Sequence, residues 1–370
     1  MRIAQIAPLI ESVPPRLYGG TERIVSYVTE ELVGLGHDVT LFASGDSMTS
    51  AKLVSCAPTA LRLDPKIKDP IPYYMLMLDR VRQCAEDFDI LHFHIDQFHF
   101  PLFRYMADRT VTTTHGRQDL PDLVPLYVGF NDMPLVSISD AQRKPVASAN
   151  FVATVHHGLP DDLLKPIFQP RGGYLAFLGR ISPEKRPDRA IEMARTLGIP
   201  LKIAAKVDKA DKDYFSERIA PLLDGPGVEF IGEINETAKN EFLGEALALL
   251  FPIDWPEPFG LSMIEAMACG TPVLAFPGGS VPEIIDEGVT GMIVDSMEAA
   301  VAALPRVVAL DRRAVRRRFE ERFSATRMAK DYVKVYRSLL DRAQFGAAEL
   351  APEQDYPSLR RRHERPEAAS

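Results

Sequence analysis

The stretch that decides the fold is Trp255-Pro256-Glu257-Pro258-Phe259-Gly260-Leu261-Ser262-Met263-Ile264-Glu265-Ala266-Met267-Ala268-Cys269-Gly270-Thr271-Pro272-Val273-Leu274-Ala275-Phe276. Its two prolines and Gly260 predict a loop, after which a short helix runs over residues 261–269. Gly270 and Pro272 predict the end of that helix. The apolar run 273–276 is typical of a buried parallel strand.

This stretch also carries the residues for a binding site. Glu257 lies in the loop and Glu265 in the helix, so two carboxylates stand eight residues apart. The unpaired backbone N–H groups of Gly260 and Leu261 form a helix N-terminus, which favours an anion. The segment therefore offers two groups that accept hydroxyl hydrogens on either side of a phosphate-sized site. That pattern suits a sugar, a diphosphate and a ribose in a row.

The segments 257–261 and 265–273 together resemble the signature of family 4 retaining glycosyltransferases of the GT-B fold. The alternative is an ordinary helix–strand unit with solvated acids. The resemblance implies an α/β protein with two Rossmann-like domains, each a doubly wound parallel sheet, which face each other across a cleft. It also implies a final helix that crosses back to the first domain.

The rest of the chain repeats the β-α-β pattern in two halves. An apolar strand over 3–8, a Gly-rich loop, a helix over 21–35 and a strand over 38–43 open the chain as in nucleotide-binding folds. The segment 161–173 has three prolines and no period, and it predicts a linker. We expect four parts: an acceptor-side domain over 1–165, a nucleotide-sugar domain over 171–325, a returning helix over 326–344, and a disordered tail over 345–370.

Three features follow the carboxyl ends of predicted strands, where ligands bind in such sheets. Gly19 and Gly20 stand where the first loop becomes a helix, and His115 follows the strand over 110–114. Arg180 and Lys185 follow the first strand of the second half. A diphosphate needs about two positive charges, which side chains supply where no metal does; the alternative is two solvated surface cations.

The resemblance assigns roles to these residues. His115, Glu257, Arg180 and Lys185 are the expected catalytic residues. The expected donor-binding set is Gly19, Gly20, Arg180, Lys185, Glu257, Phe259, Gly260, Leu261 and Glu265. The implied reaction moves a sugar from a nucleotide diphosphate-sugar, UDP- or GDP-linked, to a hydroxyl group of an acceptor. The acceptor is an unknown sugar, lipid or small molecule. The resemblance also implies that the anomeric configuration is retained and that neither a metal nor a cofactor is needed.

Several motifs leave alternatives open. His92, His94 and Asp96 fall on one face of a predicted strand over 90–96. They could form a metal triad, or His94 or Asp96 could lie at the carboxyl end of the strand and face a cleft. The basic run 311–318 is a solvated helix face or an anionic-lipid contact. Ser280 and Glu283 indicate a capping box, with Glu283 structural. The Pro-rich loop 118–130 is a candidate acceptor wall.

Composition limits the possible classes of function. The net charge of −8 argues against nucleic acid as a partner. The three cysteines are widely spaced, a strand is expected from the start of the chain with no leader, and no apolar run approaches 18 residues. These features predict a cytoplasmic protein. Peripheral contact with a membrane stays compatible with them. The rivals are a same-fold epimerase or phosphorylase, a non-catalytic nucleotide-sugar binder, and a dinucleotide-dependent redox enzyme, although the first loop lacks Gly-x-Gly-x-x-Gly.

Overall fold

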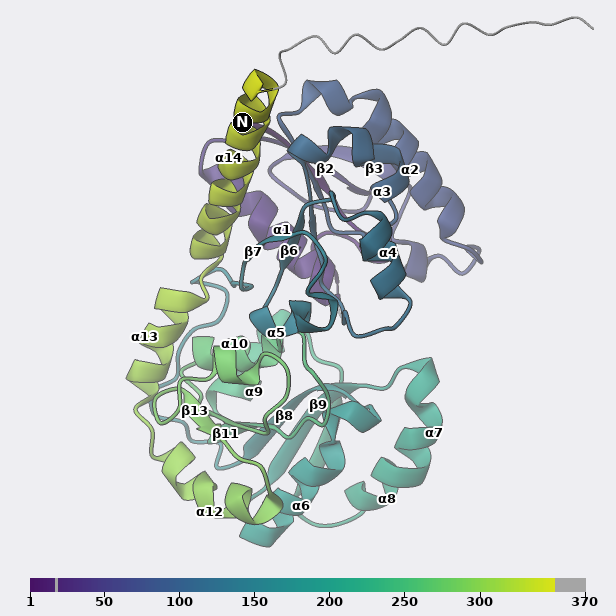
Figure 1. Ribbon diagram of the computed structural model, residues 1–370. Coiled ribbons are helices and arrows are strands. Elements are labelled where there is room, and N and C mark those ends of the chain that lie inside the picture. Colours follow the sequence, from purple (N-terminus) through teal and green to yellow (C-terminus); the bar gives the residue numbers. More distant parts are fainter. Residues whose placement is uncertain (17–18, 350–370) are drawn as a thin grey trace, which may run out of the picture.

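The computed structural model describes residues 1–16 and 19–349 and has two α/β domains, one above the other in Figure 1. The first sheet has seven strands in the order β3-β2-β1-β4-β5-β6-β7, and the second has six in the order β10-β9-β8-β11-β12-β13. Every pairing in both sheets is parallel. The predicted GT-B architecture is confirmed.

The strands are β1 Arg2–Ile6, β2 Asp38–Ser44, β3 Lys52–Ala57, β4 Ile90–Phe93, β5 Thr110–Thr113, β6 Leu135–Ser137, β7 Phe151–Thr154, β8 Leu175–Arg180, β9 Leu201–Lys206, β10 Val228–Gly232, β11 Ala248–Phe251, β12 Val273–Ala275 and β13 Gly291–Ile293. The α-helices are α1 Gly20–Gly34, α2 Ile71–Gln83, α3 Phe100–Phe103, α4 Leu123–Gly129, α5 Asp140–Arg143, α6 Pro187–Leu197, α7 Lys212–Tyr214, α8 Ala220–Leu223, α9 Glu236–Gly244, α10 Leu261–Ala268, α11 Val281–Ile284, α12 Met297–Val308, α13 Arg312–Arg322 and α14 Ala325–Glu349.

Helices cover both faces of each sheet, which explains the apolar strands. In the first helix, Ile24, Val25, Val28 and Leu32 are inaccessible to solvent, whereas Leu35, which follows α1, is exposed. The strand order reverses direction between β1 and β4 and again between β8 and β11. Ligands bind beyond the carboxyl ends of the strands at such points, so each sheet offers one edge to a common cleft.

The strand that carries His92 is shorter than predicted. β4 ends at Phe93, and Asp96 has a left-handed backbone with φ of 51°. A residue in that conformation cannot continue a strand, so His92, His94 and Asp96 do not share a strand face. Among the described residues, no three His, Cys, Asp or Glu side chains are grouped closely enough to hold a metal ion.

The capping box predicted at Ser280 is wrong. The Ser280 hydroxyl donates to the carbonyl of Phe259 at 2.8 Å instead of capping α11. The Glu283 carboxylate accepts hydrogen bonds from the backbone N–H groups of Asp140 and Ala141, both at 2.7 Å, at the start of α5 in the other domain. Burial would raise the pKa of Glu283, but these bonds and one from His156 outweigh it and lower that pKa. Glu283 thus joins the two domains through a helix N-terminus.

Two arginines of the basic run 311–318 do not lie on a solvated helix face. Arg312 and Arg316 in α13 are both 8% exposed. Arg316 donates to the carbonyls of Leu164, Ala268 and Asp161, at 2.9, 2.6 and 2.7 Å. Arg312 donates to the carbonyls of Ile167, Ala246 and Gly244. The last carbonyls of a helix lack intrahelical partners, and here the two guanidinium groups supply donors while holding the linker. Neither side chain is available for a lipid contact.

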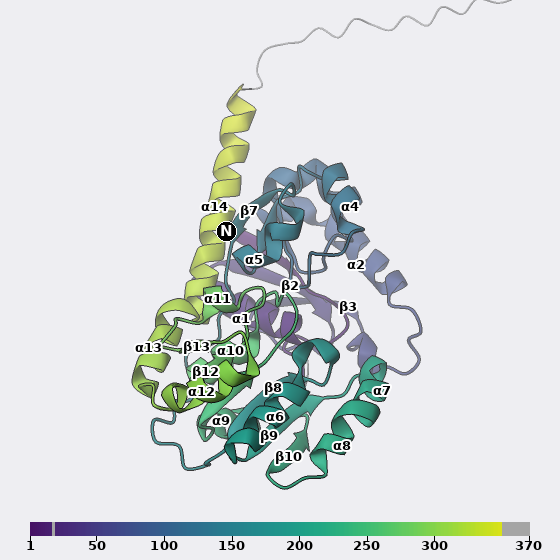
Figure 2. The same ribbon diagram turned by 60° about the horizontal axis from the view of Figure 1, so that its bottom comes forward.

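The returning helix is confirmed and is longer than predicted. α14 runs beside the first domain in both views (Figures 1 and 2), and its Thr326 hydroxyl donates to Glu31 of α1 at 2.8 Å. It continues to Glu349, so the tail expected from residue 345 is helical over 345–349. Ala347 and Ala348 have high helix propensity and extend the last turns. The disorder expected for 350–370 lies outside the described residues.

No helix in the described part of the chain combines the length and the apolar character needed to cross a membrane.

We predict that Arg316→Met lowers the free energy of unfolding by roughly 3 kcal/mol, because several buried carbonyls lose a charged donor. Urea denaturation measures the change. Arg317→Met is the matched control, since Arg317 lies on the same helix with its side chain 62% exposed, and we expect a change within about 0.5 kcal/mol. Equal effects of the two substitutions would show that the buried hydrogen bonds are not the cause.

Candidate active site

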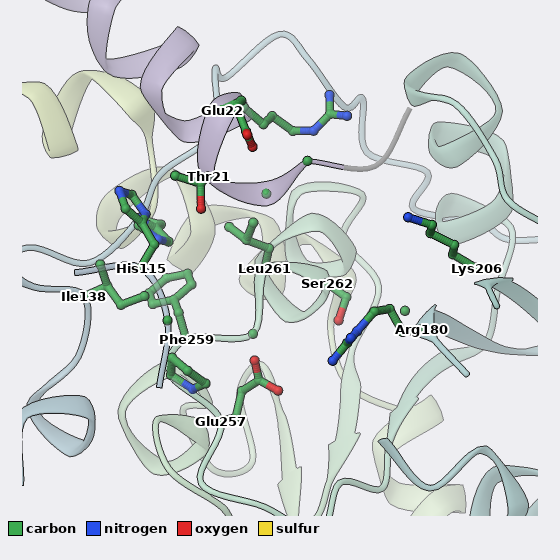
Figure 3. A pocket seen from close by; sticks show the side chains of 18 of the residues that line it. Thr21, Glu22, His115, Ile138, Arg180, Lys206, Glu257, Phe259, Leu261 and Ser262 are labelled. Carbon is green, nitrogen blue, oxygen red and sulfur yellow. The ribbon is translucent and has the colours of Figure 1, made fainter. Parts of the chain in front are cut away.

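A cleft of about 950 Å³ lies between the domains and is lined by both. It contains all ten residues singled out from the sequence. These are Gly19, Gly20, His115, Arg180, Lys185, Glu257, Phe259, Gly260, Leu261 and Glu265. Figure 3 shows His115 on one side of the cleft, Arg180 on the other, and Leu261 and Glu257 between them. The structure therefore brings the predicted residues together, while the roles assigned to them stay predictions.

The start of α10 is shaped by Gly260. This residue has a φ of 83°, and a Cβ there would lie 2.5 Å from Cε of Met263 and 3.2 Å from the ring of Phe251. Only glycine fits this conformation and this space. Phe259 is buried beside it, with its ring edge-to-face against His157 at 4.8 Å. The first backbone N–H groups of α10 consequently face the cleft, where they can bind an anion.

Gly20 brings the first domain close to the same helix. A Cβ on Gly20 would lie 3.4 Å from Cδ1 of Leu261, and one on Gly19 would lie 2.7 Å from Cβ of Pro15. The backbone of the Gly-Gly loop thus approaches the first turn of α10 from the other domain. The Gly-Gly loop and the start of α10 therefore line the same part of the cleft from opposite domains.

Glu257 is held by two donors. Its Oε2 accepts the indole N–H of Trp255 at 2.9 Å and forms an ion pair with the ammonium of Lys185. The Lys185 ammonium also lies 4.8 Å from the Trp255 ring, at cation–π distance. A buried carboxylate needs such a partner, so the charge of Lys185 is shared with Glu257 before any ligand arrives.

Glu265 has its own lysine. The Lys239 ammonium in α9 lies 2.7 Å from Glu265 and 2.8 Å from Glu236, and Arg23 of the first domain pairs with Glu236 at 2.7 Å. Burial would lower the pKa of Lys239, but the charges of Glu265 and Glu236 outweigh it and raise that pKa. This charged network joins α1 of the first domain to α9 and α10 of the second domain in the lining of the cleft.

Arg180 is the more adaptable cation. It ends β8, its side chain is 31% exposed, and it pairs with Glu184 at 2.9 Å and Asp208 at 3.6 Å. Partly exposed ion pairs are weak. The guanidinium can therefore exchange these partners for a bound anion at small cost.

His115 belongs to a chain of buried hydrogen bonds that sequence reasoning missed. Its Nε2 lies 2.9 Å from Nδ1 of His94, and Nε2 of His94 lies 2.8 Å from the side-chain carbonyl of Gln5. The Gln5 amide donates to the hydroxyl of Tyr336 in α14 at 3.2 Å. Helix α14 is thus connected to the cleft through three side chains.

This chain determines where the protons lie. Burial lowers the pKa of His115 to about 3 and that of His94 far below its usual value, so both rings are neutral near pH 7. A carbonyl only accepts, so His94 carries its proton on Nε2 and accepts from Nε2–H of His115. Nδ1 of His115 is then a bare acceptor, and it has no hydrogen-bond partner among the described residues.

Other residues in or behind the cleft also lacked a sequence signal. Lys239 lies in an ordinary polar helix, and Gln5, behind the cleft, lies inside an apolar strand. His157 stacks on His115 with ring centroids 5.3 Å apart. Only the His-His-Gly sequence itself could have drawn attention to it.

The expected acceptor wall does not line this cleft, and its role stays a prediction. The loop 118–130 is absent from the lining of the cleft, which on this side ends at Arg117. The described first-domain wall is instead built from the loop before α1 and from the segment after β4, with Tyr74 of α2. The residues directly after β5, His115 to Arg117, also line the cleft.

Comparisons with known proteins agree with this architecture. The model of the family described as Glycosyltransferase Family 4 matches residues 18–191, and that of Glycosyl transferases group 1 matches residues 165–323. A D-inositol 3-phosphate glycosyltransferase from Mycobacterium sp. (strain JLS) is 30% identical over 40% of this chain, a match that spans 37% of that relative's length. The alpha-maltose-1-phosphate synthase of Mycolicibacterium smegmatis is 28% identical over 90% of this chain and 99% of its own.

The fold is shared with solved structures. HepE from Anabaena, crystallised with UDP and glucose, superimposes with a TM-score of 0.69 at 16% identity, over 91% of this chain and all of that one. With two matching family models that together span both domains, the chain belongs to the family 4 glycosyltransferases of the GT-B fold.

Proposed function

We propose that this protein transfers a glycosyl unit from a nucleotide diphosphate-sugar to an acceptor hydroxyl, with retention of the anomeric configuration and without a metal. One observation carries the proposal. The lining of a single cleft includes Arg180 and Lys185, the N-terminus of α10, and Glu257 and Glu265, which are the groups that a diphosphate, a sugar and a ribose would need. The relatives named as glycosyltransferases and the neighbour solved with UDP and glucose support it.

The donor would lie along the second domain. Glu265 accepts the ribose hydroxyls, and the N-terminus of α10 with Arg180 and Lys185 binds the diphosphate. Glu257 accepts hydroxyls of the sugar, which then shares that carboxylate with Lys185 and Trp255. The Gly19-Gly20 backbone closes over the phosphates and the sugar from the first domain.

The chemical step follows from this placement. The bond between the anomeric carbon and the phosphate oxygen breaks, and its electron pair leaves with the diphosphate. The acceptor oxygen forms the new bond on the same face of the sugar, and its proton passes to the departing phosphate oxygen. Arg180, Lys185 and the α10 amides stabilise the negative charge that develops. His115, which is neutral at working pH, lines the cleft beside the sugar and the acceptor.

The first experiment is a thermal-shift screen of UDP-, GDP- and ADP-sugars, followed by a donor-hydrolysis assay with and without EDTA. We expect one donor class to raise the melting temperature and to be hydrolysed slowly, and EDTA to leave the rate unchanged. Binding without hydrolysis or transfer would favour a non-catalytic binder. An isomerised donor would favour an epimerase, and strict dependence on a divalent ion would contradict the metal-free mechanism.

We predict that Glu265→Ala weakens nucleotide binding about 100-fold, because two hydrogen bonds to a charged group are lost. Calorimetric titration measures the affinity. The matched control is the 2′,3′-dideoxy form of the same nucleotide, which should bind the unchanged protein about as weakly. The variant should no longer distinguish the two nucleotides; a variant that still does so would show that Glu265 does not bind the ribose.

We predict that the double variant Arg180→Ala/Lys185→Ala lowers kcat by roughly 100-fold or more, with a smaller change in donor affinity, because the charge grows as the diphosphate leaves. Steady-state rates at saturating donor measure kcat. Lys202→Ala on β9, a cation outside the cleft lining, should leave kcat unchanged. Full activity of the double variant would exclude this role.

We predict that His115 stays neutral, with its proton on Nε2, from pH 5.5 to 8, since burial holds its pKa at about 3. The ¹⁵N shifts of labelled histidine report the tautomer, and His115→Gln identifies the signal. Gln5→Met removes the carbonyl that orients His94 and should yield a mixture of tautomers at His115. Gln97→Met, which alters a different amide of the same domain, should not. A proton found on Nδ1 in the unchanged protein would contradict the proposed chain.

A further inference from the structure

The first-domain wall of the cleft holds a group of residues that the donor does not use. Asp96 and Phe98 come from the segment after β4, and Tyr74 comes from α2. The donor-binding residues lie on the second domain and on the Gly19-Gly20 loop. A cleft of about 950 Å³ is at the large end for a single small ligand, so room remains for a second one beside this wall.

The first observation is a fixed aromatic surface. The rings of Tyr74 and Phe98 are stacked, with centroids 5.6 Å apart and an interplanar angle of 12°. The Tyr74 hydroxyl accepts the backbone N–H of Leu9 at 3.1 Å, which holds that ring. Phe98 nonetheless remains 56% exposed while lining the cleft. A rigid aromatic ring that covers its partner on one side and is open to a pocket on the other suits the C–H face of a ring-shaped ligand.

The second observation is the carboxylate two residues earlier. Asp96 has a φ of 51°, a conformation that non-glycine residues adopt rarely and mostly at functional sites. No hydrogen bond or ion pair to this carboxylate occurs among the described residues that surround it. Desolvation by the surrounding protein raises the pKa of the Asp96 carboxyl. Asp96 is therefore an open acceptor placed beside the aromatic surface.

The third observation is the charge balance of this wall. Each of its arginines already has a carboxylate partner: Arg62 pairs with Glu11 at 3.0 Å, Arg117 with Asp119 at 2.6 Å, and Arg23 with Glu236 at 2.7 Å. Glu22, which also lines the cleft, is buried. These ion pairs do not involve Asp96, whose carboxylate stays an acceptor for hydroxyl hydrogens, and a negatively charged group placed next to it would be repelled.

We infer that Asp96, Phe98 and Tyr74 form the acceptor subsite, and that the acceptor is an uncharged polyhydroxylated ring, a sugar or a cyclitol, rather than its phosphate ester. This inference rests on the proposed glycosyl transfer. The ring stacks on Phe98, Asp96 accepts one or two of its hydroxyls, and Tyr74 keeps Phe98 in place. Tyr74 is a positioning residue.

The test compares donor hydrolysis with transfer, using the donor found in the screen. The acceptors are a panel of uncharged sugars and cyclitols, including glucose, mannose and myo-inositol, with glucose 1-phosphate and inositol 3-phosphate as charged counterparts. We expect lower KM values for the uncharged members. Phe98→Ala should raise the acceptor KM about tenfold while donor hydrolysis stays unchanged. Asp96→Asn should also raise that KM and reduce the preference over phosphate esters.

The matched control is Tyr105→Ala. Tyr105 is 68% exposed in the 3₁₀ helix Arg104–Arg109 of the same domain and is not part of the cleft lining, so its loss should change neither reaction. If the unchanged protein hydrolyses no donor, the proposed function fails and this inference fails with it. If hydrolysis proceeds but only phosphate esters are glycosylated, or Phe98→Ala leaves the acceptor KM unchanged, the inference alone is overturned.

Discussion

Two buried pairs of a lysine and a glutamate control the electrostatics of the cleft. Lys185 neutralises Glu257, and Lys239 neutralises Glu265, with the four side chains between 7% and 16% exposed. A carboxylate this far from water is stable only with a charged or hydrogen-bonded partner. The two glutamates of the motif therefore depend on two lysines that lie elsewhere in the chain, and a donor must bind by sharing these partners rather than by meeting free charges.

The same principle explains how the domains are held around the cleft. Glu283 accepts two amides from α5 across the gap, and Arg312 and Arg316 complete the carbonyl ends of helices while holding the linker. In each case a side chain satisfies backbone groups that would otherwise be buried without partners. These contacts give the linker 161–173 a defined path, although it contains no helix or strand of its own.

The two walls of the cleft differ in how they are built. The second-domain wall is a continuous motif, and its geometry follows from local rules: a loop of prolines, a glycine that only fits with positive φ, and a short helix. The first-domain wall is assembled from segments far apart in sequence, among them Tyr74, His94 and Asp96. Behind this wall, Gln5 links His94 to Tyr336 on the returning helix. This difference matches the division of labour that we propose, with the donor bound by the second-domain wall and the acceptor by the first-domain wall.

The sequence by itself determined the two-domain parallel architecture and nearly all its elements, because apolar strands, helical stripes and glycine or proline boundaries are local signals. The resemblance to the family motif, together with glycines, a histidine and cations placed after predicted strands, also identified the ten cleft residues. Prediction from the sequence was wrong about the capping role of Ser280 and the exposure of Arg312 and Arg316. Only the tertiary structure decided the partners of Glu257, Glu265 and His115. The lysine and histidine partners lie 21 to 72 positions away in the sequence, and no local pattern encodes which lysine or imidazole lies beside which carboxylate or ring.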